Sequence, residues 1–265
     1  MPLAWSYCVL DGDGTVIDAL DADEVHSTAS IGKLFLLCEA AERIVAGQLE
    51  PDRMITRHPD MRVADSGLWQ HLHQASLPII DVCLLVGAVS DNWATNTLLD
   101  VIGLPAVTSR ARALGCVHSG LHDRVRDSRL AEHPPTLSSG TARELAGVAW
   151  RIHAAAAGAG SVGISQDAAT LVEQWLLAGV DLSLVAAPFH LDPLAHMNGP
   201  VWLWSKTGVD TEVRADVGVA WTHAQALAYA ALASWSPGSA LPEHPVDRMQ
   251  ELGRALEARL LADSR

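Results

Sequence analysis

Three short polar motifs constrain the fold of this 265-residue chain more than any other feature of its sequence. They are Ser30-Ile31-Gly32-Lys33, Ser90-Asp91-Asn92 and Lys206-Thr207-Gly208. Each alone is common by chance, but each lies in a suitable context. The first opens an apolar helical run, the second lies between two predicted helices, and the third ends an apolar strand. In this order, the three indicate one functional arrangement rather than three coincidences.

Hydrophobic periodicity predicts strands at both ends of the chain and helices between them. The first two strands, at 5–10 and 15–20, are joined across Asp11-Gly12-Asp13-Gly14, because Asp-Gly is a strong hairpin signal. Helices are predicted at 30–46, 78–88, 91–102, 104–115, 141–156, 167–178, 224–234 and 245–262, and further strands at 201–206 and 215–221. This order fits a sheet built from both chain ends with a helical insertion.

Ser30 and Lys33 have the spacing of a nucleophile and its base. A serine hydroxyl is a weak nucleophile until a base removes its proton. Residues three apart on a helix share a face, so Lys33 is placed beside Ser30. In a dry site near other cations, a lysine can lose its charge and act as that base. A capping serine followed by a solvated lysine is the alternative for an isolated motif.

Taken together, the three motifs resemble those of the class A β-lactamases and penicillin-binding proteins. The resemblance covers almost the whole chain, from Trp5 to the last predicted helix. It implies an α/β (α+β) fold, with an antiparallel sheet flanked by helices and an all-helical lobe beside it. Residues 1–45 and 196–265 would form the sheet lobe, and residues 46–195 the helical lobe.

The same resemblance implies roles for residues of the second and third motifs. Ser90 would relay a proton to the leaving nitrogen, and Asn92 would hydrogen-bond the side-chain amide of the substrate. Lys206 and Thr207 would bind a substrate carboxylate, and Gly208 would let the acyl group approach the backbone.

Three further site residues follow from the resemblance. The N–H groups of Val209 and Ser30 would form the oxyanion hole. Arg214 would be a second partner of the carboxylate, although its spacing is one residue shorter than usual; a solvated strand-edge arginine is the alternative. Trp69 lies where the family has a cleft-edge aromatic, and would either stack on substrate or pack in the core.

The loop that removes the acyl group is where the chain departs from the class A pattern. Family members use a glutamate in E-x-x-L-N to position a water. The best match, 127–131, places Asp127 at the glutamate and Ala131 at the asparagine, with Glu132 as a second candidate in poorer register. An aspartate is one methylene shorter, and a displacement of about 1 Å can cost about a hundredfold in rate. Slow deacylation is therefore expected, unless Asp127 is a solvated or arginine-paired loop residue.

These residues predict a serine acyl-enzyme hydrolase that opens a β-lactam, or a related amide or ester, through Ser30. An intracellular esterase, a peptidase or an acyl transferase of a biosynthetic pathway fits the same residues. A non-catalytic binder would explain the altered loop but not the intact nucleophile and lysines. The expected partner is a small molecule bearing a carboxylate, and no metal or organic cofactor is implied.

A rival resemblance is confined to Val9-Leu10-Asp11-Gly12-Asp13-Gly14-Thr15. It is similar to the first motif of the haloacid dehalogenase-type phosphatases, D-x-D-G-T, which Asp11 and Asp13 would match. There the first aspartate attacks phosphate beside Mg²⁺. That fold needs a series of parallel βα units and a late acidic pair, and the chain shows neither.

Charge and the N-terminal sequence bear on partners and location. The formal net charge of −13 argues against nucleic acid and anionic membrane surfaces as partners. The first residues show neither the basic region nor the long apolar run of a secretory signal, which predicts a cytoplasmic location, or a secreted one if leading residues were removed. The disulfide of many class A enzymes would match Cys83 but miss Cys38 by one position, and a cytoplasmic location argues against it.

Overall fold

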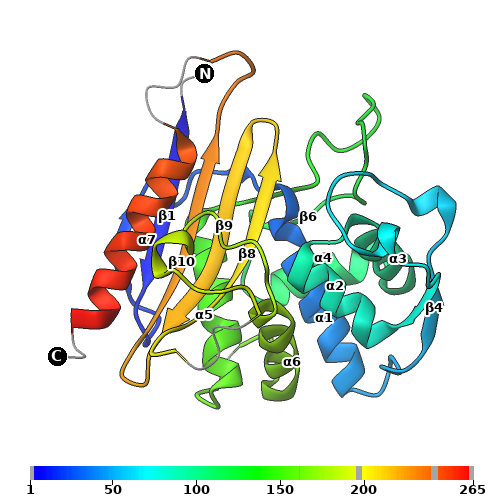
Figure 1. Ribbon diagram of the computed structural model, residues 1–265, viewed down its shortest axis with the longest axis horizontal. Coiled ribbons are helices and arrows are strands. Elements are labelled where there is room, and N and C mark those ends of the chain that lie inside the picture. Colours follow the sequence, from blue (N-terminus) through cyan, green and yellow to red (C-terminus); the bar gives the residue numbers. More distant parts are fainter. Residues whose placement is uncertain (1–2, 161, 195–198, 240–243, 263–265) are drawn as a thin grey trace.

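The two ends of the chain build one antiparallel sheet in the computed structural model (Figure 1). The structure describes residues 3–160, 162–194, 199–239 and 244–262. The five strands lie in the order β2-β1-β10-β9-β8. Their bounds are Ala4–Leu10 for β1, Val16–Leu20 for β2, Trp202–Asp210 for β8, Val213–Trp221 for β9 and Ala226–Ser234 for β10. β8 is an edge strand, and it ends the sheet on the side of the remaining helices.

The first hairpin forms as its Asp-Gly turn predicts. Asp11 Oδ1 accepts hydrogen bonds from the N–H groups of Asp13 (3.0 Å) and Thr15 (2.9 Å). An aspartate side chain that binds the following backbone in this way stabilises a turn. Asp11 and Asp13 are thus turn residues, and the antiparallel sheet is not the parallel βα fold of a haloacid dehalogenase-type phosphatase.

The largest difference from the sequence prediction is β10, because the sequence predicts a helix at 224–234. Its alanine content favours a helix in isolation. In the fold β10 lies between β1 and β9, and seven consecutive residues of it are buried. A strand covered on both faces lacks the polar alternation that identifies a strand, so burial overrides propensity here.

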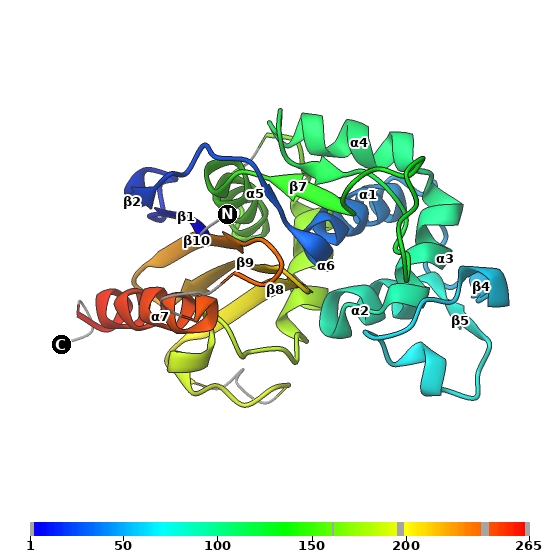
Figure 2. The same cartoon turned by 90° about the horizontal axis from the view of Figure 1, so that it is seen from above.

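Helices cover both faces of the sheet (Figure 2). α5 (Ala142–Ala156) lies on one face and α7 (Pro245–Ala262) on the other. Successive side chains of a strand point to opposite faces, so the sheet contributes to two separate cores. On β10, one core takes Ala228, Ala230 and Leu232, and the other takes Leu227, Tyr229 and Ala231.

The other helices pack together beside β8. They are α1 (Lys33–Val45), α2 (Ile79–Val89), α3 (Asn92–Ile102), α4 (Leu104–Ala113) and α6 (Gln166–Leu177). The first six residues of α1 are all buried, so this helix begins inside the molecule. Among the described residues, no helix is long and apolar enough to cross a membrane.

Short strands and 3₁₀ turns connect these helices. A three-stranded sheet joins β3 (His26–Ser27), β7 (Ser138–Gly140) and β6 (Gly120–Leu121), and β4 (Met54–Thr56) pairs with β5 (Ser76–Pro78). The 3₁₀ turns are η1 (Ala29–Gly32), η2 (Pro59–Met61), η3 (Trp69–His71) and η4 (Ala187–Phe189). The lobe beside the sheet is therefore mostly, not entirely, helical. The proposed boundaries at 45 and 195 stay a prediction, and α5, which lies within 46–195, packs on the sheet.

All four cysteines are buried and free. Cys38 lies on α1 and Cys83 on α2, and no disulfide joins them. Burial raises the pKa of the Cys38 thiol to about 12. A thiol in that state is protonated and unreactive at neutral pH, so these side chains serve as small core residues.

Candidate active site

Ser30 lies in η1, the turn that leads directly into α1. The preceding residue, Ala29, has a φ of +48°, a left-handed conformation that a side chain disfavours. Ser138 on β7 holds this turn, because its Oγ donates to the Ala29 carbonyl (2.6 Å) and accepts from the Gly32 N–H (3.3 Å). Such strain persists only where neighbours enforce it, and it is common at functional sites. Ser30 lines two adjoining cavities on either side of this turn.

Lys33 is fully buried at the start of α1. Its Nζ lies 2.6 Å from the Ser90 carbonyl, 2.8 Å from Asn92 Oδ1 and 3.2 Å from Ser90 Oγ. Burial, together with the nearby Lys206 charge, holds the pKa of Lys33 well below the usual lysine value. Lys33 therefore loses its proton more readily than an exposed lysine, and its neutral form carries the free electron pair that a base requires.

No hydrogen bond joins Lys33 to Ser30 within the part of the chain that the structure describes. Catalytic hydrogen bonds are often long or absent before a substrate binds, and tighten in the complex. The position of Lys33 one helical turn from Ser30 is the one that the first motif predicts.

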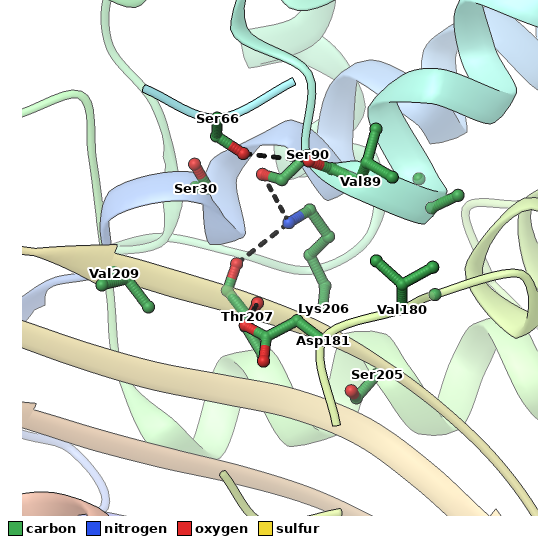
Figure 3. Close-up of a pocket in the computed structure, with 13 residues that line it drawn as sticks. Ser30, Ser66, Val89, Ser90, Val180, Asp181, Ser205, Lys206, Thr207 and Val209 are labelled. Atoms are coloured by element: carbon green, nitrogen blue, oxygen red, sulfur yellow. Dashed lines mark hydrogen bonds between the residues drawn. The ribbon is translucent and has the colours of Figure 1, made fainter. Parts of the chain in front are cut away.

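Ser90 brings a second lysine into the same network (Figure 3). It ends α2 in a left-handed conformation, with a φ of +53°. Its Oγ lies 2.9 Å from Lys206 Nζ and 3.2 Å from Lys33 Nζ. Burial lowers the pKa of Lys206 to about 8, although the charges of Asp181 and Asp216 oppose the fall. One hydroxyl thus links two buried lysines.

The protonation of this network follows from its charges. Two charged lysines would repel each other across Ser90 in a dry site. With Lys33 neutral, Lys206 donates to Ser90 Oγ and the Ser90 hydroxyl donates to Lys33 Nζ, so each group has a suitable partner. The arrangement can pass a proton from Lys33 to a group bonded at Ser90.

Asp91 and Asn92 fix the loop that faces Ser30 from the helical side. Asp91 Oδ2 accepts from the Trp69 N–H at 2.7 Å. Asn92 Nδ2 donates to the Ala64 carbonyl at 2.9 Å, while its Oδ1 accepts from Lys33. Asn92 therefore holds both the loop and the lysine, and one amide hydrogen is left for a substrate.

Trp69 does not line the cleft. Its side chain is fully buried in the core, and its Nε1 donates to the Gln74 carbonyl at 2.9 Å. The alternative of substrate stacking is therefore wrong, and Trp69 is a core residue. Ser66 of the same loop lines the cleft instead, with its Oγ donating to the Val89 carbonyl at 2.9 Å.

The third motif lies on β8, the free edge that faces Ser30. Lys206 Nζ donates to the Thr207 carbonyl at 2.9 Å, so the backbone of Thr207 points off the sheet (Figure 3). Backbone groups of an edge strand face the neighbouring strand and the open side in alternation, residue by residue. The N–H of Val209 therefore also points off the sheet, beside the two cavities that Val209 lines with Ser30.

Gly208 lets this edge approach the nucleophile. A Cβ built at Gly208 would lie well inside the van der Waals radius of the Thr28 carbonyl oxygen and 3.3 Å from Ser30 N. Because only glycine fits, β8 contacts the η1 turn directly. The N–H groups of Ser30 and Val209 can then meet at one point, as an oxyanion hole requires.

Arg214 lies on β9 and turns away from this edge. Its guanidinium donates to the Asp210 carbonyl at 2.6 Å and lies 5.7 Å from the centre of the Trp235 ring. It is not among the residues that line either cavity beside Ser30. Its role as a carboxylate partner stays a prediction that this geometry does not support.

Asn96 on α3 determines which residue of the following loop faces the cleft. The Val125 N–H donates to Asn96 Oδ1 at 2.8 Å, and Asn96 Nδ2 donates to the Val125 carbonyl at 3.0 Å. Val125 lines the same cavity as Ser30 and Asn92. An aliphatic residue therefore lies at a loop position that borders the cavity of the nucleophile.

Asp127, the predicted deacylation residue, lies on another side of this loop. It lines a cavity that does not include Ser30, and its Oδ1 accepts from the Ala64 N–H at 2.9 Å. Ala131 and Glu132 are exposed and line neither cavity beside Ser30. A role of Asp127 in deacylation has no support from its position.

Two arginines of the loop line the cavity next to Val125. Arg126 Nε lies 2.7 Å and an Arg129 guanidinium nitrogen 2.6 Å from Asp123 Oδ2. Against the opposing effect of burial, these hydrogen bonds hold the pKa of Asp123 below its ordinary value. The ion pairs clamp the base of the loop. Among the described residues, no cluster of three or more His, Cys, Asp or Glu side chains could hold a metal.

The structure brings most of the predicted residues to one cleft. They are Ser30, Lys33, Ser90, Asn92, Lys206, Thr207, Gly208 and Val209. Sequence reasoning missed Val125, Asn96 and Asp181. No sequence signal singled them out: Asn96 is one of several polar residues of α3, and that its amide is buried and needs partners is known only from the structure.

Comparisons with known proteins identify a family and a fold. The chain matches the family model described as the β-lactamase enzyme family over residues 4–260. No curated protein sequence matches it. A solved β-lactamase from Sphaerobacter thermophilus is 23% identical, with a TM-score of 0.81, and the match covers 97% of this chain and 92% of that one.

Two further solved structures share the fold. An acyl-enzyme complex of a PBP-A mutant with penicillin G is 18% identical, with a TM-score of 0.78 over 97% of this chain and 90% of that chain. A variant of the class A β-lactamase of the last common ancestor of Gram-negative bacteria is 21% identical, with a TM-score of 0.78 over 98% and 94% of the two chains. At these identities the likeness shows the fold alone.

Proposed function

The chain belongs to the β-lactamase enzyme family, and on that premise we propose that it is a serine acyl-enzyme hydrolase acting through Ser30 on a β-lactam or a related amide or ester. The observation that carries the proposal is the Ser90 hydroxyl, held between the buried Nζ atoms of Lys33 and Lys206. A base with a lowered pKa, linked to a proton carrier beside a serine, is the arrangement that nucleophilic catalysis needs.

Acylation proceeds in two proton transfers. Neutral Lys33 takes the proton of Ser30 as its Oγ attacks the substrate carbonyl, and the N–H groups of Ser30 and Val209 stabilise the oxyanion. Lys33, now charged, passes a proton through Ser90 to the leaving nitrogen or oxygen as the bond to the carbonyl carbon breaks. Lys33 ends neutral, and the acyl group is on Ser30.

Deacylation is slow in this proposal. The loop presents Val125 to the cavity beside Ser30, and Asp127 binds the Ala64 N–H instead. An isopropyl group cannot take a proton from water. The acyl-enzyme is therefore long-lived, which equally suits an acyl transferase whose acceptor is not water.

Intact-protein mass spectrometry tests the proposal. We expect a stable adduct after hours with millimolar benzylpenicillin, located on Ser30 by peptide mapping, and little colour change with nitrocefin. Ser30→Ala should give no adduct. Rapid colour without an adduct would overturn the slow deacylation, and the absence of any adduct with β-lactams and aryl esters alike would overturn the nucleophilic role of Ser30.

The solved complex of a PBP-A mutant is consistent with this proposal, because that protein forms an acyl-enzyme with penicillin G on the same fold. The adduct proposed here would be the equivalent state of this chain.

A further inference from the structure

A carboxylate of the protein itself lies where a substrate carboxylate is expected. Asp181 lines the same cavity as Ser30, Lys206 and Thr207. Its Oδ2 accepts a hydrogen bond from Thr207 Oγ1 at 2.8 Å, and Figure 3 shows the two side chains together. Its Oδ1 accepts from the Ser183 hydroxyl at 2.6 Å, which fixes the carboxylate from behind.

Most hydrogen-bond donors of Thr207 and Lys206 are already used within the protein. A threonine hydroxyl has one proton to give, and that of Thr207 goes to Asp181. Lys206 gives one proton to Ser90 and another to the Thr207 carbonyl, so one is left. A substrate carboxylate entering here would find one donor instead of the two or three that usually hold it.

The charges lead to the same conclusion. Burial raises the pKa of Asp216 to about 8, so this neighbour of Lys206 favours its uncharged form. With Lys33 also neutral, the carboxylate that balances the charge of Lys206 is Asp181. Arg214, the other expected cation, is engaged with backbone carbonyls. An incoming carboxylate would therefore meet a like charge at contact distance, which is strongly unfavourable in a partly closed site.

We propose, building on the proposed function, that Asp181 is a specificity-determining residue that disfavours acyl donors carrying a carboxylate at the Lys206–Thr207 end of the cleft. The preferred donor bears a neutral or cationic group on that side of the scissile bond. This replaces the carboxylate-bearing substrate expected from the sequence with an uncharged or cationic ester or amide.

Benzylpenicillin and its methyl ester form a matched pair of probes, because they differ by one methyl group, which removes the charge of the carboxylate. The measurement is the second-order rate constant for labelling of Ser30, followed by intact-protein mass spectrometry. We expect the wild type to react with the methyl ester at least about tenfold faster than with the free acid. Asp181→Asn should raise the rate for the free acid about tenfold or more and change that for the ester by less than about threefold.

Asp100→Asn is the control, because it removes an exposed carboxylate on α3 that lines neither cavity beside Ser30. Its ratio of the two rates should stay within about threefold of the wild-type ratio. Asp181→Ala guards against a distorted amide side chain in the asparagine variant and should behave as Asp181→Asn does. A wild type that prefers the free acid, an unchanged ratio in both Asp181 variants, or an equal shift in Asp100→Asn would overturn the inference.

A fluorophosphonate, which labels activated serines without needing a carboxylate site, separates the two claims. If it labels Ser30 while neither penicillin reacts with any variant, the inference about Asp181 is overturned and the nucleophile stands. If nothing labels Ser30, the proposed function itself fails, and the inference with it.

Discussion

Asn96 holds the backbone of Val125 by two hydrogen bonds. The N–H of Val125 donates to Asn96 Oδ1, and Asn96 Nδ2 donates to the Val125 carbonyl. A backbone gripped on both sides has little freedom to rotate, so the side chain of Val125 has a defined direction. Val125 lines the cavity beside Ser30 and also the neighbouring cavity that Asp127 lines. The loop therefore places at the cavity of Ser30 a residue that cannot activate water.

Val125→Glu should convert the slow acyl-enzyme into a hydrolytic one. A glutamate at this position would bring a carboxylate, on a backbone held by Asn96, to the cavity that Ser30 lines. General-base catalysis typically contributes about 10² to 10⁴ in rate, so deacylation should rise by about a hundredfold or more. Decay of the penicillin adduct, followed by mass spectrometry, measures it.

Val125→Gln is the control for that change, because it has the same shape without a base. It should leave the adduct as stable as in the wild type. A glutamine variant that deacylates as fast as the glutamate variant would mean that added polarity, rather than a base, admits the water.

The acylation rate should follow a bell-shaped pH profile set by the two lysines. Lys33 must be neutral to act as base, so the rate rises with pH through its pKa, which burial lowers well below the usual lysine value. Lys206 must be charged to polarise Ser90. Because its pKa is about 8, the acylation rate should fall as the pH rises above about 8. A neutral aryl ester, titrated from pH 5 to 10, avoids ionisation of the substrate.

Two variants assign the limbs of that profile. Lys33→Ala should lower the acylation rate by about 10² to 10⁴ at neutral pH. Lys206→Gln should remove the alkaline limb while leaving the acidic one. An alkaline limb that persists in Lys206→Gln would assign it to another group.

The sequence was sufficient for the part of the site whose geometry is local. Ser30 and Lys33 are one turn apart on a helix, and Lys206 and Thr207 adjoin on a strand, so spacing alone places them. The contacts of Asp181 and Val125 instead join loops to distant elements, and no periodic pattern marks such contacts in advance. The prediction for Asp127 rests on a short motif match, whereas it is the contact with Asn96 that places Val125 at the cavity of Ser30.

The same difference between local and distant contacts explains which elements of the fold the sequence predicts. Amphipathic helices such as α5 and the Asp-Gly hairpin of β1 and β2 carry their own signals. β10 does not, because its position at the centre of a doubly covered sheet determines its structure. Alanine-rich segments are read correctly only once their neighbours are known.

Gly208→Ala should impair catalysis by moving β8 away from the Ser30 turn. The added methyl would overlap the Thr28 carbonyl, and backbone is not easily displaced. A shift of about 1 Å in the oxyanion hole can lower the rate about a hundredfold. Gly12→Ala is the control, since its Cβ would find no atom closer than 3.9 Å. Equal acylation rates in the two variants would mean that β8 does not supply the oxyanion hole.

Asp216→Asn should change how stability depends on pH. Burial raises the pKa of Asp216 to about 8, whereas its ordinary value is 3.8. Between these values the folded chain keeps a proton that the unfolded chain releases, so this group makes stability fall as pH rises from about 4 to 8. Lys206 acts oppositely above pH 8, because its pKa is lowered from 10.5 to about 8 and the unfolded chain there holds the extra proton.

The amide that Asp216→Asn introduces copies the protonated carboxyl and can accept from the Val185 N–H, which lies 2.9 Å from Asp216 Oδ2. The variant lacks this titration, so its free energy of unfolding relative to the wild type should rise between pH 5 and pH 8. The expected rise is more than about 1.4 kcal/mol, the equivalent of one pKa unit. Urea unfolding at both pH values measures the difference. Asp210→Asn, an exposed carboxylate on the same sheet, should show a much smaller change over that range. A difference between Asp216→Asn and the wild type that is the same at pH 5 and pH 8 would mean that Asp216 is already ionised in the folded chain, and that its charge is held by Lys206.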